Sequence, residues 1–118
     1  MNVRLYHNPR CSKSRAALQL LRDAGVEPEI VEYLKTPPTA AELDAICTRL
    51  GMPPQRLVRF KEDVARSLGL KPTDERPRAA WLRLLAEHPV LIERPIAVKG
   101  RAARLGRPPE AVLELLRG

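Results

Sequence analysis

The chain has 118 residues, with 21 Lys and Arg against 14 Asp and Glu and a net charge of +7 at pH 7. Its length fits one hydrophobic core, and it has neither an apolar run near the roughly 18 residues of a membrane span nor a signal segment after Met1, so we expect a soluble, cytoplasmic protein. The basic residues are spread along the chain without interleaved aromatic residues, which argues against nucleic-acid binding and favours an Arg-rich solvated surface.

Strand and helix patterns alternate at the start of the chain. Val3–Tyr6 alternates in hydrophobicity as a strand does. Ser12–Ala24 carries an apolar stripe at helical spacing, and Gly25 is placed to end that helix. Glu29–Tyr33 then predicts a second strand, followed by a proline-rich turn at 35–38.

Helical patterns fill the middle of the chain. Thr39 and Glu42 form a capping box at the start of a helix that Gly51 ends. Three further helical segments are expected, and they cover about 53–60, 62–68 and 78–88. Together these segments predict a helical insert over about residues 39–89.

The last third of the chain predicts a hairpin and a helix. Residues 96–98 and 101–104 are expected to pair around Lys99-Gly100, and Pro108 suits the first turn of a final helix. Strand, helix, strand, insert, hairpin and helix is the order of the thioredoxin/glutaredoxin topology. The sequence therefore predicts a single α/β domain over 1–118, with a mixed four-stranded sheet flanked by helices and a right-handed crossover between its first two, parallel strands.

Cys11 is the main candidate for a reactive group. It lies in a polar loop between the first strand and the first helix, where free backbone N–H groups and the positive end of the helix dipole point. A thiol in that position has a pKa below its free value of about 8.5 and is a ready nucleophile, and the same N–H groups can hold an oxyanion. The motif is Cys11-x-x-Ser14, so any disulfide would form with an external thiol.

Several neighbouring features bear on this site. His7, four residues before Cys11, could donate to the thiolate or favour it by charge, or could be an ordinary loop histidine. Ser14 could bond the thiolate or an oxyanion, or could face solvent. Cys47 lies on the apolar stripe of a helix, and we predict that it is a buried core residue rather than a redox-active one.

Two other kinds of chemistry fit the sequence poorly. The cysteine-phosphatase loop needs an arginine six residues after its cysteine, and here that residue is Ala17. Two histidines and two distant cysteines give no ligand cluster at zinc spacing, so no metal ion is expected.

Three arginines could hold an oxyanion beside Cys11. Arg59 ends a short helical stretch, Arg94 precedes Pro95 before the late strand, and Arg107 lies in the loop before the last helix. A guanidinium grips an oxyanion with two parallel hydrogen bonds. The Arg94–Pro95 bond is predicted to be cis, as in thioredoxin-like folds, with Pro95 facing the cysteine.

The chain resembles the glutaredoxin-linked arsenate reductase family (ArsC-like) over essentially its whole length. The resemblance is carried by four blocks in order, namely Tyr6-His7-Asn8-Pro9-Arg10-Cys11-Ser12-Lys13-Ser14-Arg15, Tyr33-Leu34 with Thr36-Pro37-Pro38, Glu93-Arg94-Pro95-Ile96, and Leu105-Gly106-Arg107-Pro108-Pro109-Glu110. The chain stops directly after its last helix at Gly118, so it resembles the short form of the family.

The resemblance implies a function and a set of partners. Cys11 would be the nucleophile, His7 and Ser14 would support its thiolate, and Arg59, Arg94 and Arg107 would bind arsenate or a similar oxyanion. Glutathione would be a co-substrate, glutaredoxin would recycle the enzyme, and no cofactor would stay bound to what we expect to be a monomer.

Two other readings remain open. One is a glutathione-dependent thiol–disulfide oxidoreductase on the same fold, which would need Cys11 but not the three arginines. The other is a regulator of the Spx type that binds RNA polymerase, although the redox switch of that group is Cys-x-x-Cys and this chain has Ser14 at the second position.

Overall fold

The computed structural model describes residues 2–117. The chain forms two compact units: the first joins residues 1–36 to residues 94–118, and the second contains residues 37–93. The helical insert expected over about 39–89 falls within the second unit. The single-domain organisation over 1–118 stays a prediction.

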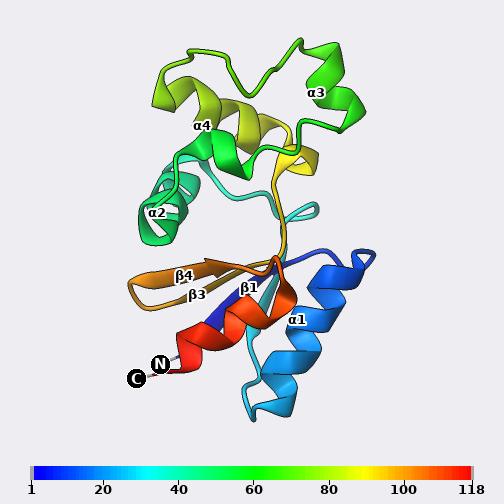
Figure 1. Ribbon diagram of the computed structural model, residues 1–118, viewed down its shortest axis with the longest axis vertical. Coiled ribbons are helices and arrows are strands. Elements are labelled where there is room, and N and C mark those ends of the chain that lie inside the picture. Colours follow the sequence, from blue (N-terminus) through cyan, green and yellow to red (C-terminus); the bar gives the residue numbers. More distant parts are fainter. Residues whose placement is uncertain (1, 118) are drawn as a thin grey trace. The chain divides into compact units, whose positions relative to one another are not determined.

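A mixed four-stranded sheet forms the centre of the first unit. Its strands lie in the order β2-β1-β3-β4, which are Glu29–Glu32, Val3–His7, Ile96–Lys99 and Ala102–Leu105. β1 pairs in parallel with β2 and antiparallel with β3, and β3 pairs antiparallel with β4. The predicted thioredoxin-like α/β architecture is therefore confirmed (Figure 1).

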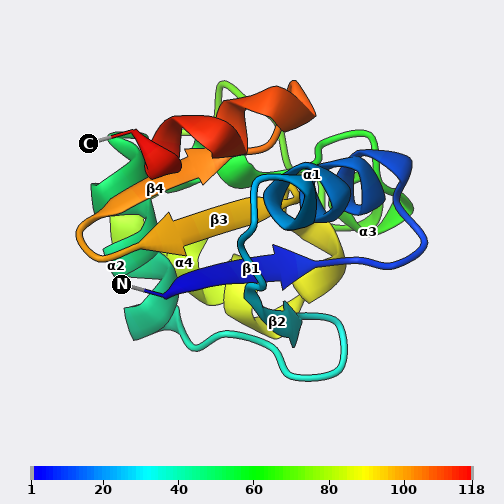
Figure 2. The ribbon, with the colours of Figure 1, turned by 90° about the horizontal axis from the view of Figure 1, so that it is seen from below.

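One face of this sheet packs against two helices, α1 (Ser12–Asp23) and η3 (Pro109–Leu116), as Figure 2 shows. The core between them is built from buried apolar side chains of both layers, which are Val3, Leu5, Ala17, Leu21, Ala97, Val112 and Leu115. The alternation of β1 and the helical stripe of α1 account for this packing. The sheet and α1 together fix the loop between them, which carries Cys11.

The end of the chain differs from its prediction in two details. The hairpin turn is Gly100-Arg101 rather than Lys99-Gly100, and a positive φ of 60° at Gly100 gives the backbone that a tight hairpin needs. Pro108 lies outside the last helix as its N-cap, and Pro109 opens the helix, which winds as a 3-10 helix. Because a first-turn proline loses no helical hydrogen bond, either proline could open it, and the local pattern could not choose between them.

The second unit consists of short helices. They are α2 (Ala40–Leu50), η1 (Pro54–Leu57), α3 (Asp63–Ser67), α4 (Arg78–Glu87) and η2 (Pro89–Leu91), of which η2 was not predicted. The capping box of Thr39 and Glu42 is present, and Gly51 ends α2 in the left-handed conformation, as predicted. Trp81 is fully buried, with Phe60 at its edge 6.1 Å away between ring centres. Within residues 2–117 no helix is long and apolar enough to cross a membrane.

Candidate active site around Cys11

Cys11 is the N-cap of α1 and closes the loop that leaves β1. Its N–H donates to the carbonyl of Asn8 at 3.0 Å, and its own carbonyl accepts from the N–H of Arg15 at 3.0 Å. The side-chain amide oxygen of Asn8 in turn accepts from the N–H of Arg10 at 3.0 Å. These short-range bonds hold the cysteine at the helix start, with 9% of its surface exposed. The predicted strand–loop–cysteine–helix arrangement is thus the one observed.

The surroundings of Cys11 lower the pKa of its thiol. Burial alone acts in the opposite direction, because it disfavours the charged thiolate. The backbone N–H of Ser14, the positive charge of Arg94 and the backbone N–H of Lys13 all favour the thiolate, as does a hydrogen bond from the Arg94 side chain, and together they outweigh burial. The neutral thiol makes no regular capping hydrogen bond, so these N–H groups are available to the thiolate.

Cys47 has the opposite character. It is fully buried in α2, and burial raises the pKa of its thiol to about 11. A thiol with that pKa is protonated throughout the physiological range and is a poor nucleophile. The predicted contrast between a reactive Cys11 and a packing Cys47 agrees with these environments.

Arg94 reaches Cys11 from the segment that leads into β3. The Arg94–Pro95 bond is cis, as predicted, and Pro95 is buried. The Nε of Arg94 is itself buried and has no hydrogen-bond partner within residues 2–117. A buried guanidinium donor beside a thiolate is suited to an incoming anion, since an unpaired donor is costly to bury.

Arg107 lies beside Arg94 because two loops pack closely. Its Nη1 donates to the carbonyl of Arg94 at 3.1 Å, and the N–H of Gly106 donates to the carbonyl of Pro95 at 2.8 Å. A Cβ on Gly106 would stand 2.6 Å from Cγ of Pro95, so only glycine allows this approach. The Arg107–Pro108 bond is also cis, which was not predicted from the sequence. The first unit therefore brings Cys11 and Arg94 together and docks Arg107 on Arg94.

Arg59 belongs to the second unit, and its described contacts all lie there. Its guanidinium forms ion pairs with Glu62 and, at 3.5 Å, with Glu93, and its backbone N–H donates to the carbonyl of Leu91 at 2.7 Å. Two carboxylates thus hold Arg59 in place. The predicted approach of Arg59 to Cys11 stays a prediction.

Ser14 and His7 support the loop in ways that spacing alone did not reveal. Ser14 is fully buried, and its hydroxyl accepts a hydrogen bond from the N–H of Asn8 at 3.3 Å. The backbone N–H of Ser14 favours the thiolate of Cys11 by hydrogen bonding. His7 ends β1 and is 5% exposed, and burial lowers its pKa, which leaves the ring neutral near pH 7. No described contact joins the His7 ring to Cys11, so its predicted support of the thiolate is not among the interactions within residues 2–117.

A pocket of about 250 Å³ adjoins this loop. Its lining combines the loop with the end of β2 and the turn after it, namely His7, Asn8, Pro9, Arg10, Glu32, Leu34 and Lys35. Arg15 was not singled out from the sequence, yet its Nη1 donates to the carbonyl of Pro9 at 3.0 Å and so braces the loop. Within residues 2–117 no cluster of three or more His, Cys, Asp or Glu side chains could hold a metal ion.

Comparison with known proteins settles the family. The ArsC family model matches residues 6–115, which include every candidate residue named above. The chain belongs to the ArsC family. An arsenate reductase of Neisseria meningitidis serogroup A is 44% identical over 97% of each chain. The uncharacterized protein YfgD of Escherichia coli K12 is 49% identical over 97% of this chain and 96% of its own.

The solved structures agree with this assignment. The arsenate reductase of Vibrio cholerae superposes with a TM-score of 0.92, at 44% identity and over 98% of each chain. Sequence and fold are therefore shared over nearly the full length of an ArsC-family protein.

Proposed function

We propose that this protein is an arsenate reductase in which Cys11 is the nucleophile. Relatives named arsenate reductase match almost the whole chain, which supports an oxidoreductase of this type. The observation that carries the proposal for this chain is the pairing of Cys11 with Arg94. The same guanidinium that lowers the pKa of the thiol has a buried Nε with no hydrogen-bond partner among the described residues.

The first step would be attack of the Cys11 thiolate on the arsenic of arsenate. A sulfur–arsenic bond forms, and one oxygen leaves as water after taking up a proton. Arg94 and Arg107 would bind the remaining oxygens, and the backbone N–H groups at the start of α1 would share their charge. Planar guanidinium groups suit a tetrahedral oxyanion because each can donate two parallel hydrogen bonds.

Reduction would then need two external thiols. Glutathione replaces a second oxygen on arsenic, which again leaves as water. A thiol of glutaredoxin attacks the glutathione sulfur, forms a mixed disulfide with it, and leaves the bonding electron pair on arsenic, which becomes arsenic(III). Water then releases arsenite and restores the Cys11 thiol. External thiols are required here because Cys47 is fully buried in the second unit, with its thiol protonated.

A coupled assay tests the proposal. Arsenate, glutathione and glutaredoxin are supplied in excess, and oxidised glutathione is followed through glutathione reductase and NADPH. Wild-type protein should turn over, Cys11→Ser should be inactive, and Cys47→Ser should keep its activity as the matched control. Arg94→Ala should lose roughly ten- to hundredfold in kcat/KM for arsenate, the worth of one charge-assisted hydrogen bond, and Arg94→Lys should recover only part of it.

A thiol–disulfide oxidoreductase is the second candidate, because a low-pKa Cys11 at a helix start is sufficient for that reaction. Reduction of a small mixed disulfide by glutathione distinguishes the two. If Arg94→Ala and Arg107→Ala keep wild-type arsenate kinetics while Cys11→Ser abolishes disulfide reduction, the oxidoreductase is the correct function and the oxyanion site is wrong.

A further inference from the structure

A second concave site lies in the first unit, between the β3–β4 hairpin and the end of η3. It has a volume of about 380 Å³ and is lined by Lys99, Gly100, Arg101, Ala102, Arg104, Glu114, Leu115 and Arg117. None of these residues belongs to the Cys11 site. We call this concavity the hairpin pocket.

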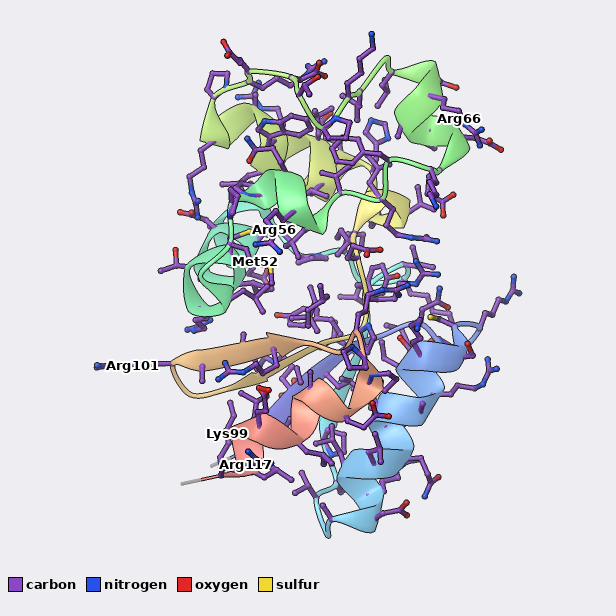
Figure 3. All side chains as sticks on the ribbon, viewed as in Figure 1. Met52, Arg56, Arg66, Lys99, Arg101 and Arg117 are labelled. Atoms are coloured by element: carbon purple, nitrogen blue, oxygen red, sulfur yellow. The ribbon has the colours of Figure 1, made fainter. Side chains whose placement is uncertain are left out.

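The hairpin pocket gathers positive charge. Four of its side chains are cationic and one, Glu114, is acidic, so the lining carries a net charge of +3. Arg104 is the cation that uses this carboxylate, at 3.3 Å. Lys99, Arg101 and Arg117 have no ion-pair partner within residues 2–117. Figure 3 labels Lys99 and Arg117, which line the same pocket, at this end of the unit, and shows the Arg101 side chain extending from the turn away from them.

Among the described residues outside the pocket, six arginines form ion pairs with carboxylates, namely Arg4, Arg22, Arg59, Arg66, Arg76 and Arg78. In the hairpin pocket, four cations share one concavity with a single carboxylate. Like charges that share a pocket repel one another, and the repulsion is greater where protein atoms displace water. An anion bound among these cations would offset their mutual repulsion, so anion binding would be favourable at this pocket.

The sheet register explains why these cations meet. Lys99 pairs with Ala102, and Ala97 pairs with Arg104 across the hairpin. Alternate residues of a strand share a face, so Lys99, Ala102 and Arg104 lie on the face of Ala97, which packs in the core with η3. η3 covers the middle of this face and ends at Leu116, so Arg117 meets the open end of the hairpin.

We propose that the hairpin pocket binds a small anion with linked phosphate groups, such as an inorganic polyphosphate or the phosphate chain of a nucleotide. Several guanidinium groups and one ammonium group can share the oxygens of adjacent phosphates, and arginine forks match phosphate geometry. The volume falls within the range of small-ligand sites. A single phosphate would engage only part of the lining, so linked phosphates should bind more tightly.

Calorimetric titration at near-physiological salt tests the proposal with inorganic tripolyphosphate, and with orthophosphate for comparison. Tripolyphosphate should bind at least about tenfold more tightly, since each added charge-assisted contact is worth roughly that factor. Equal affinity for the two ions, or no binding of tripolyphosphate, would overturn the proposal. A parallel titration with ATP separates the two sources: tighter binding than tripolyphosphate indicates a nucleotide, and equal or weaker binding indicates the inorganic chain.

Variants locate the charge that matters. Arg101→Ser/Arg117→Ser removes two exposed cations from the pocket and should weaken tripolyphosphate binding at least about tenfold. Arg56→Ser/Arg83→Ser removes two exposed cations from the second unit and serves as the control of equal charge. Glu114→Gln should instead tighten binding by up to about fivefold, because it frees Arg104 and removes the negative charge. Equal losses in the two double variants would show nonspecific attraction and overturn the proposal.

Amide chemical shifts distinguish this site from the Cys11 site, where the proposed function also places an anion. On titration with tripolyphosphate, the largest ¹H–¹⁵N shifts should occur at Gly100, Arg101 and Arg117. Largest shifts at Cys11 and Ser14 would place the ion at the active-site loop and overturn the assignment. Arsenate turnover by Arg101→Ser/Arg117→Ser is expected to stay at the wild-type rate, so the outcome is independent of the proposed function.

Discussion

At the scale of single residues, two cysteines of one chain differ because of what surrounds each sulfur. Burial alone would raise the pKa of both thiols, and it acts more strongly on Cys47, which is fully buried, than on Cys11, which is 9% exposed. Neighbouring groups add to this difference: Ser14, Lys13 and Arg94 favour the thiolate of Cys11, whereas among the described residues Arg78 is the group whose charge opposes burial at Cys47. At Cys11 the helix N-terminus and one guanidinium thus lower the pKa of the thiol by more than burial raises it.

This difference predicts selective alkylation. A thiol with a lowered pKa keeps its thiolate at lower pH, so iodoacetamide should modify Cys11 at pH 6 while Cys47, with a pKa of about 11, stays unmodified. The alkylation rate of Cys11 should rise through a pKa below the free-thiol value and then level off. Mass spectrometry of peptides from a pH series measures both rates, and slow, equal labelling of the two cysteines at pH 6 would contradict the prediction.

At the scale of elements, the sequence predicted those helix boundaries that depend on contacts between neighbouring residues. Thr39 with Glu42, and Gly25 and Gly51, gave correct helix boundaries because a cap is a contact among neighbours in sequence. The approach of Gly106 to Pro95 could not be predicted, since it joins residues from different loops. The same holds for the ion pair of Arg59 with the distant Glu93, and for the bond from the Asn8 N–H to the Ser14 hydroxyl, which the folded chain brings together.

The capping box of α2 allows a measurable prediction. The Thr39 hydroxyl accepts from the N–H of Glu42 at 3.1 Å, and Thr39→Ala should lower the free energy of unfolding by about 1 kcal/mol. Thr48→Ala is the matched control in the same helix, because the Thr48 hydroxyl only donates back to the carbonyl of Asp44 and alanine favours a helix. Urea denaturation followed by circular dichroism compares them, and an equal loss in both variants would show that the cap contributes nothing.

The close packing of Gly106 against Pro95 should link stability to anion binding. In Gly106→Ala the new Cβ would meet Cγ of Pro95 at 2.6 Å, so the loop that carries Arg107 must move. We expect the free energy of unfolding to fall by about 1–3 kcal/mol, the usual cost of an added methyl group in a packed region. Arsenate binding should also weaken. Thermal denaturation and KM for arsenate measure the two effects. Wild-type values of both would mean that the loop accommodates the methyl group.

At the scale of the whole molecule, the three candidate arginines come from two units. Within the first unit Arg94 lies beside Cys11, and Arg107 is held against the carbonyl of Arg94. Arg59 is fixed within the second unit by Glu62 and Glu93. These carboxylates would lower the attraction of Arg59 for an anion, since part of its charge is already compensated.

This arrangement predicts unequal contributions to arsenate turnover. Arg94→Ala should reduce kcat/KM by roughly ten- to hundredfold. Arg59→Ala should reduce it by less than about tenfold, because the Arg59 guanidinium shares its donors with two carboxylates. Glu62→Gln leaves Arg59 with one carboxylate fewer and should raise its share, so that Arg59→Ala costs more in that background than in the wild type. A double-mutant cycle measures this coupling. If Arg59→Ala leaves arsenate kinetics unchanged in both backgrounds, the second unit supplies no ligand to the oxyanion, and the site consists of the first unit alone.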